Sequence, residues 1–235
     1  CGEGTPAFNV NRLCGSGLQA IVNASQSILL GDTDVAIGGG AENMSRVPFA
    51  SLNMRWGARM GDTKMVDMMI GALHDPFHNI HMGVTAENIA AKWGITREDQ
   101  DRLAVESHNR AERATQAGVF KDQIVPVTLK SKKGDVHYAT DEHFRPGATM
   151  EDLAKLKPAF LKENGTVTAG NASGINDAAA AVVLMEAGAA KARGAKPLAR
   201  LVAYAHAGVD PKYMGIGPVP ATQLALKKAG LTVND

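Results

Sequence analysis

Residues 7–38 read AFNVNRLCGSGLQAIVNASQSILLGDTDVAIG, and this stretch decides the fold. Residues 7–13 alternate apolar and polar side chains, which predicts a short strand. Glycines then permit a sharp turn, and apolar residues recur at helical spacing over 16–30. Residues 34–38 predict a second, buried strand. A strand, a helix and a strand in this order are typical of the repeating unit of a parallel sheet, so the sequence predicts an α/β fold.

The remainder of the chain interrupts this α/β pattern with a long insertion, roughly residues 44–175. Residues 44–83 are rich in Met, Arg and Gly and show no clean period. Thr96 with Asp99 three residues later has the signature of a helix N-cap. The elements we expect beyond residue 83 are helices at 85–93, 96–117, 187–193 and 221–229, a short helix near 150–156, a hairpin within 124–140, and strands at 176–186 and 198–205.

Composition excludes several classes of protein. Apolar residues make up 45% of the 235 residues and charged residues 21%, which is typical of a globular domain with a full core. The net charge of +1 gives no basic field for nucleic acid or anionic lipid. The sequence contains no apolar run of the ~18 residues that span a bilayer, and the N-terminus has no signal pattern. The 2 cysteines indicate a reducing compartment, so we expect a cytoplasmic protein.

Cys14 is the strongest candidate for chemistry. It lies where the first strand ends and the helix begins, so backbone N–H groups and the helix dipole can stabilise a thiolate. The same N–H groups can hold an oxyanion after the thiolate attacks a carbonyl. Position alone leaves a second interpretation open, in which Cys14 is a buried and inert small hydrophobic residue.

Four motifs resemble those of the thiolase family in order and spacing, over essentially the whole chain. The first, Val-Asn-Arg-Leu-Cys-Gly-Ser-Gly, surrounds Cys14, and the second is Gly-Gly-Ala-Glu-Asn-Met-Ser at 39–45. The third begins Asn-Ala-Ser-Gly-Ile-Asn-Asp at 171–177, and the fourth is Met-Gly-Ile-Gly-Pro-Val-Pro at 214–220. The resemblance is strongest to bacterial biosynthetic thiolases and β-ketothiolases, and it identifies Cys14 as the nucleophile.

The resemblance implies a layered αβαβα thiolase fold, incomplete here, with an inserted α+β loop domain. It divides the chain into part of an N-terminal thiolase domain (1–43), the loop domain that covers CoA (44–175), a return to the N-terminal domain (176–195) and the start of a C-terminal domain (196–235). It also implies a loop at 52–62 between dimers, hence a homotetramer built as a dimer of dimers.

The activity implied by the resemblance is acyl transfer between acyl-CoA and acetyl-CoA by ping-pong chemistry, with Cys14 carrying the acyl group. The partners are then acyl-CoA, acetyl-CoA and CoA, without nucleic acid, membrane, metal or cofactor, since the CoA thioester is the substrate. By matching position, Arg145 contacts the adenine nucleotide and Met214 lies near the reacting thioester. The residues expected to line the pantetheine path are Leu73, His81, Met82, Ala169, Ser173 and Ile175.

The sequence departs from the family pattern at its end. The family motifs Asn-Glu-Ala-Phe, Gly-His-Pro and Cys-x-Gly-Gly-Gly, which supply the activating histidine and the second cysteine, are absent from these 235 residues. Cys1 does not replace the second cysteine because it precedes the nucleophile motif. We therefore interpret the chain as an internal fragment and expect that it does not complete turnover alone.

Other interpretations compete for some of these features. A cysteine hydrolase would need a histidine partner and no CoA tunnel, and a structural or assembly role would need no chemistry at all. His74, His78 and His81 have a spacing that could bind Zn²⁺ on one helix, but Pro76 disfavours that helix. The glycines at 38–40 lack the spacing of a phosphate loop and predict close packing of a strand on a helix. Ser16 is expected to hydrogen-bond at the helix start.

Overall fold

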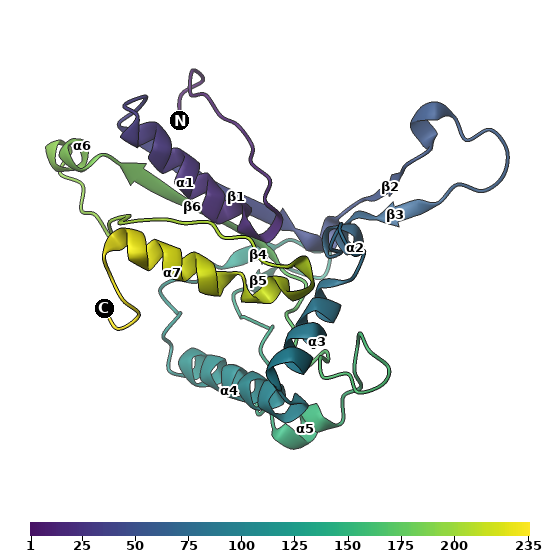
Figure 1. The fold of residues 1–235 in the computed structure, drawn as a ribbon. Helices are drawn as coiled ribbons and strands as arrows, with labels where there is room; N and C mark the ends of the chain where they lie inside the picture. The colour runs from purple at the N-terminus through teal and green to yellow at the C-terminus, as the bar shows by residue number, and fades with distance from the viewer. The chain divides into compact units, whose positions relative to one another are not determined.

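The computed structural model describes all residues 1–235, which form two compact units (Figure 1). The first unit contains Cys1–His74, Ile175–Asp210 and Ile216–Asp235. The second contains Asp75–Gly174 and Pro211–Gly215. Each unit therefore combines segments that are far apart in the sequence. None of the helices has both the length and the apolar character that crossing a membrane requires.

The first unit is built on helix α1 (Ser16–Leu29) and two long strands, β1 (Val35–Asn43) and β6 (Asp177–Met185). The strands pair antiparallel, from Val35 opposite Met185 to Asn43 opposite Asp177. A small hairpin pairs β2 with β3. The other elements of this unit are η1 (Leu13–Gly15), η2 (Met44–Arg46), β2 (Phe49–Ser51), η3 (Met54–Trp56), β3 (Met65–Asp67), α2 (Met68–Ala72), α6 (Ala187–Ala192) and α7 (Pro218–Ala229).

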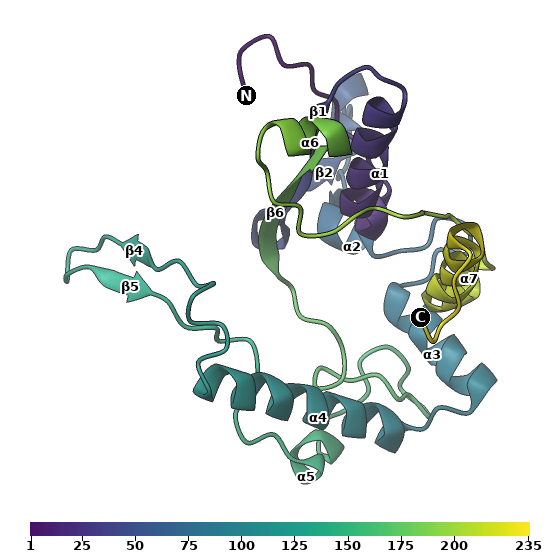
Figure 2. The same ribbon diagram turned by 90° about the vertical axis from the view of Figure 1, so that its left-hand side faces the viewer.

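Helix α1 lies directly against strand β1, as the view in Figure 2 shows. A Cβ atom placed on Gly38 would lie 3.0 Å from both the N and Cα atoms of Ile21, closer than side chains normally approach backbone. Two residues along the strand, a Cβ on Gly40 would lie 3.8 Å from the Cα of Gly17, which is ordinary contact. The prediction that the glycines at 38–40 pack a strand closely on a helix is confirmed at Gly38, whereas a Cβ on Gly39 would instead lie 2.9 Å from Ala180 O of β6.

A hydrogen-bonded clasp closes the far end of the β1–β6 pair. The Ser45 hydroxyl donates to Asp177 Oδ2 at 2.5 Å and the Ser45 backbone N–H donates to Asp177 Oδ1 at 3.0 Å. These bonds lower the pKa of Asp177, with the hydroxyl as the largest cause and the backbone N–H next. The clasp thus ties the second sequence motif to the third, although 132 positions separate the two residues.

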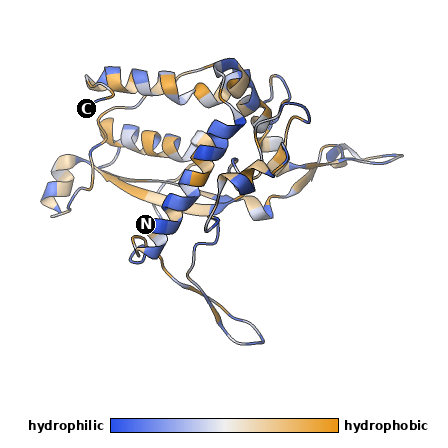
Figure 3. Cartoon of the chain, turned by 90° about the horizontal axis from the view of Figure 1, so that it is seen from below, coloured by the Kyte–Doolittle hydropathy of each residue, from blue (hydrophilic) through white to orange (hydrophobic).

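The second unit is centred on helices α3 (Met82–Trp93) and α4 (Arg97–Gln116), followed by the hairpin of β4 (Val127–Leu129) with β5 (Val136–Tyr138) and the short helix α5 (Met150–Ala154). Residues Pro211–Gly215, most of η4 (Pro211–Ile216), also belong to this unit. Thr96 and Asp99 form the predicted capping box of α4, which satisfies backbone N–H groups at the helix start. Figure 3 shows α4 as largely hydrophilic, whereas the apolar colour runs along β1 and β6.

Two predicted strands, residues 7–13 and 198–205, are wrong. Neither segment makes a strand ladder with any part of the chain. Leu13 has φ +49°, a left-handed conformation that turns the chain before the strand could continue into Cys14. A strand exists only through bonds to a neighbour, so its own alternation of side chains does not create it. The predicted parallel unit is also wrong, since β1 pairs antiparallel with β6 instead.

The burial predicted for residues 34–38 is wrong for one face. Ile37 is 54% exposed, and Val183, its partner on β6, is 66% exposed. Helix α1 packs on the face toward which Gly38 is directed, and Ile37, the preceding residue of the strand, points to the opposite face. The β2–β3 hairpin and helix α2 lie in residues 44–83, where no period had predicted any element. The short segments there are too brief for a periodic pattern to emerge.

We predict that Gly38→Ala destabilises the first unit, because the added methyl group must push the backbone of α1 away from β1. Overpacking of this kind costs about 1–3 kcal/mol, measured as a lower urea midpoint of unfolding. Gly40→Ala is the matched control on the same strand, since its Cβ meets only ordinary contact. Equal midpoints for the two variants would contradict the close approach.

We also predict that acid weakens the clasp. The folded-state pKa of Asp177 lies below its unfolded value, so its stabilising contribution is present above about pH 3.9 and is lost as the pH falls through the folded pKa. Ser45→Ala removes the largest cause of the shift, so the urea midpoint should decline less steeply with acid in this variant. Asp122→Asn, at an exposed site outside the clasp, should keep the parent slope. A Ser45→Ala slope identical to that of the parent would exclude the clasp as the cause.

Candidate active site

Cys14 lies in a tight turn that leads into α1, and its thiol is free and exposed. Ser16 holds this turn from within: its hydroxyl donates to Leu13 O at 2.7 Å and accepts from the Arg12 N–H at 2.8 Å. The prediction that Ser16 is a hydrogen-bonding residue at the helix start is confirmed. The Arg12 guanidinium donates to Gln19 Oε1 at 2.8 Å, which anchors the turn to the helix. The exposure of Cys14 contradicts the alternative in which it is a buried, inert residue.

The residue before the cysteine is strained. Leu13 has φ +49°, and its backbone N–H donates to Asn11 Oδ1 at 2.9 Å. A leucine in the left-handed region is uncommon and persists only where its surroundings enforce it. Such strain is concentrated at functional turns, and here it sets the entry of the chain into the start of the helix beside Cys14. Sequence patterning missed this feature because no motif reports a backbone angle.

His81 and Met82 lie together at the start of α3 in the second unit, both half-buried. His81 is the N-cap, and its Nδ1 accepts the Gly83 N–H at 3.0 Å, so in the neutral ring the proton lies on Nε2. The imidazole stacks on the ring of Phe160 at 4.7 Å between centroids. A Cβ on Gly83 would lie 2.2 Å from that ring. Sequence analysis missed Phe160 because residues 141–170 have no period.

Ala169 and Ser173 are exposed on one irregular loop of the second unit. The loop is held by its own side chains and backbone: the Thr168 N–H donates to Asn171 Oδ1 at 2.8 Å, and the Gly170 N–H to Thr168 Oγ1 at 3.1 Å. Thr168, within the same loop, is fully buried. The two predicted substrate-lining residues therefore lie on an exposed part of a loop that is held by internal hydrogen bonds and by the buried Thr168.

Arg145 belongs to the same unit, on the segment that follows the β4–β5 hairpin, and is exposed. Its backbone N–H donates to His108 Nδ1 on α4 at 3.2 Å. Two residues later the Gly147 N–H donates to Glu112 Oε2 at 2.8 Å. Helix α4 thus anchors the backbone at Arg145 and two residues beyond it, while the residue stays exposed.

Met214 lies on η4, and this segment packs on α3. The Asn88 side chain donates to Lys212 O at 3.1 Å, and the rings of Trp93 and Tyr213 meet edge to face at 5.9 Å. Lys92 lies over the Tyr213 ring at 4.2 Å. Helix α3 therefore positions both His81 at its start and the segment of Met214 along its length.

The predicted site residues divide between the two units. Cys14, Leu73 and Ile175 belong to the first unit, where Leu73 is the C-cap of α2 and Ile175 lies two residues before β6. The second unit contains the other six, His81, Met82, Arg145, Ala169, Ser173 and Met214. All nine are exposed or half-buried. No three His, Cys, Asp or Glu side chains are grouped so that they could hold a metal ion.

The sequence matches two family models. Residues 1–188 match the thiolase N-terminal domain, and residues 195–235 match the thiolase C-terminal domain. The chain therefore belongs to the thiolase family. It is 70% identical over 230 residues to the β-ketothiolase BktB of Cupriavidus necator, covering 98% of this chain and 58% of that protein. It is 54% identical over 230 residues to an acetyl-CoA acetyltransferase of Rhizobium meliloti, covering 97% of this chain and 58% of the relative.

Solved structures agree with the family. The human mitochondrial 3-ketoacyl-CoA thiolase matches with a TM-score of 0.92 at 46% identity, over 99% of this chain and 59% of that one. The same human enzyme in complex with CoA matches with a TM-score of 0.91 at 45% identity, over 99% and 58% of the two chains. The predicted thiolase fold is confirmed, and the chain spans little more than half the length of these relatives.

We predict that Gly83→Ala displaces the Phe160 ring from His81, because the new methyl group would overlap the ring. The ring-current shift that Phe160 imposes on the His81 imidazole protons should then relax toward the free-histidine value in proton NMR spectra. Gly71→Ala is the control, since its Cβ would meet only Val66 Cγ1 at 3.8 Å. An unchanged His81 resonance in Gly83→Ala would show that the ring does not depend on this glycine.

Proposed function

We propose that this chain carries the acyl-accepting half of an acyl-CoA:acetyl-CoA C-acyltransferase, with Cys14 as the nucleophile. The observation that carries the proposal is the exposed, free Cys14 in a strained turn at the start of α1, in a chain of the thiolase family. A helix start stabilises a thiolate through its N–H groups and dipole. An exposed thiol is also accessible to a substrate as large as a CoA thioester.

In the proposed half-reaction, Cys14 Sγ loses its proton and attacks the carbonyl carbon of acyl-CoA. The negative charge passes to the carbonyl oxygen, which N–H groups at the turn, including that of Cys14, stabilise. Collapse of this intermediate breaks the carbon–sulfur bond to CoA, which leaves as a thiolate and takes up a proton. The product is an acyl-Cys14 thioester, which the carbanion of acetyl-CoA or free CoA then attacks.

The proposed binding surface for CoA draws on the residues predicted from the sequence. His81 supports this role because it lies half-buried at the start of α3, where its Nδ1 accepts the Gly83 N–H and its ring stacks on Phe160. Arg145 is exposed and supplies a permanent positive charge for the nucleotide end. Met214 is 41% exposed and offers a flexible apolar contact for the acyl group. The pantetheine arm is assigned to Leu73, His81, Met82, Ala169, Ser173 and Ile175.

We further propose that residues 44–175 form the loop domain that covers CoA. The clustering of Asp75–Gly174 in one compact unit supports this, whereas residues 44–74 cluster with the first unit. The other boundaries, 1–43, 176–195 and 196–235, stay predictions, as does the cytoplasmic location. A homotetramer is supported by the apolar side chains on the β2–β3 hairpin, where Trp56 is 86% and Met60 98% exposed. Exposed apolar surface of this kind is typical of protein–protein contacts.

The proposal is tested by the reactivity of Cys14. Incubation with acetyl-CoA should transfer one acetyl group to Cys14, detected by peptide mass, and should block alkylation of Cys14 by iodoacetamide. Cys1, also free and exposed, is the internal control and should be alkylated with or without acetyl-CoA. A cysteine hydrolase would show no protection by CoA itself, and a purely structural chain would show neither effect.

Cys14→Ser should form no acyl-enzyme, because a serine hydroxyl at a helix start is far less acidic than a thiol and is a poor nucleophile without a base. The variant should keep the parent urea midpoint, which shows that the loss is chemical. Acyl transfer to this variant at the parent level would refute the assignment of Cys14.

A further inference from the structure

A buried carboxylate of the second unit accepts hydrogen bonds from one loop. Glu87, on α3, is only 4% exposed. It accepts the Thr166 backbone N–H with both oxygens at 2.9 Å, the Thr166 hydroxyl at 2.6 Å and the Val167 N–H at 2.9 Å. These four bonds of the carboxylate go to residues 166 and 167, near the start of the loop that carries Ala169 and Ser173.

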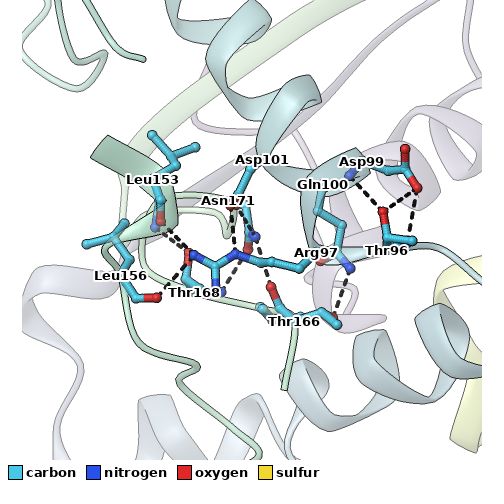
Figure 4. A network of polar contacts seen from close by, with 12 residues as sticks. Thr96, Arg97, Asp99, Gln100, Asp101, Leu153, Leu156, Thr166, Thr168 and Asn171 are labelled. Atoms are coloured by element: carbon cyan, nitrogen blue, oxygen red, sulfur yellow. Dashed lines mark hydrogen bonds and ion pairs between the residues drawn. The ribbon is translucent and has the colours of Figure 1, made fainter. Parts of the chain in front are cut away.

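A second buried carboxylate holds the other side of the same loop (Figure 4). Asp101, on α4, is 2% exposed and pairs with Arg97 at 2.7 Å. Its Oδ1 accepts the side-chain N–H of Asn171 at 2.9 Å, and Asn171 also donates to Thr166 O at 3.0 Å. The Arg97 guanidinium continues to Leu153 O at 2.6 Å, so the network reaches α5 as well.

The partners of Glu87 are all donors. A buried carboxylate costs much free energy unless donors surround it, and here three backbone or hydroxyl groups of the loop supply them. An amide at this position would keep the shape, but its NH₂ group would face N–H groups and leave buried donors unpaired. The loop can therefore keep this conformation only while residue 87 is an acceptor on both oxygens.

The loop is closely packed against its neighbours at two glycines. A Cβ on Gly170 would lie 2.5 Å from Leu156 Cδ1, and one on Gly165 would lie 2.4 Å from Leu161 O. The Ala159 N–H donates to Val167 O at 2.9 Å, so the loop is also tied to the segment of Phe160, on which His81 stacks. Three of the proposed contacts with the ligand, at His81, Ala169 and Ser173, thus lie on this loop or against the segment tied to it.

We propose that Glu87, seconded by Asp101, is a positioning residue for the CoA-binding surface: it fixes the loop 165–174 in the form that accepts the pantetheine arm. The inference rests on the proposed function, since it assigns that role to the loop. Glu87 itself is buried beneath the loop and does not touch the ligand. Its effect is therefore on the binding of CoA and not on the intrinsic reactivity of the Cys14 thiol.

The test is protection of Cys14 from iodoacetamide by CoA, measured by peptide mass over a range of CoA concentrations. Glu87→Gln should raise the CoA concentration that half-protects Cys14 by about tenfold, because a charged buried acceptor of several bonds is lost. The rate of alkylation without CoA should stay at the parent value. Amide hydrogen exchange at Thr166 and Val167 should accelerate in the variant, while exchange in α4 stays at the parent rate.

Two further variants complete the design. Glu98→Gln is the matched control, an exposed carboxylate on α4 that pairs only with Arg102, and it should behave as the parent. Thr166→Val removes the hydroxyl bond to Glu87 and keeps the backbone bonds, so it should give a smaller rise of about threefold. Should Glu87→Gln fail to fold, Thr166→Val decides the question by the same measurement.

The outcomes separate the two proposals. Parent-like protection in Glu87→Gln or, if it does not fold, in Thr166→Val overturns the positioning role and leaves the proposed function standing. An equal loss in Glu98→Gln also overturns it, since loss of charge alone would then explain the effect. If CoA does not protect Cys14 in the parent chain, the proposed function fails, and the positioning role fails with it.

Discussion

The close approach of helix α1 to strand β1 is the constraint on which the first unit depends. Gly38 lets the backbone of Ile21 come within 3.0 Å of where a side chain would begin. Because the helix cannot move away without losing this contact, its first turn is fixed relative to the strand, with Gly17 opposite Gly40. Cys14 lies at the head of that turn. The position of the thiol therefore depends on the close packing of α1 on β1 that Gly38 and Gly40 allow.

The second unit solves a different problem, which is how to hold irregular chain in one conformation. Residues 139–149 and 155–176 contain no helix or long strand, and their backbone groups need partners from elsewhere. Helices α3 and α4 supply them through acceptors on their buried and half-buried faces, from Glu87 and Asp101 to His108 and Glu112. A flexible ligand arm gains affinity from a surface ordered in advance, since less entropy is lost on binding.

Features that depend on residues close in sequence could be predicted, whereas strands that need a partner far along the chain could not. The capping box at Thr96, the hairpin near residues 127–138 and the turn role of Ser16 each depend on neighbours within a few positions, and the structure confirms them. The strands expected at 7–13 and 198–205 need partners elsewhere in the chain and are absent. The stacking of Phe160 on His81 joins residues 79 positions apart, and no period or motif announced it.

The sequence by itself determined the family, the fold class and the identity of Cys14 as the candidate nucleophile, because these follow from residue types at fixed short spacings. Only the tertiary structure decided that β1 pairs antiparallel with β6 and that Leu13 has a left-handed backbone conformation. It alone also decided that both oxygens of Glu87 accept hydrogen bonds from one loop. The physical reason is that hydrogen bonding and close packing are satisfied between segments far apart in the chain. A residue's own type states what it can donate or accept, and the fold alone selects its partner.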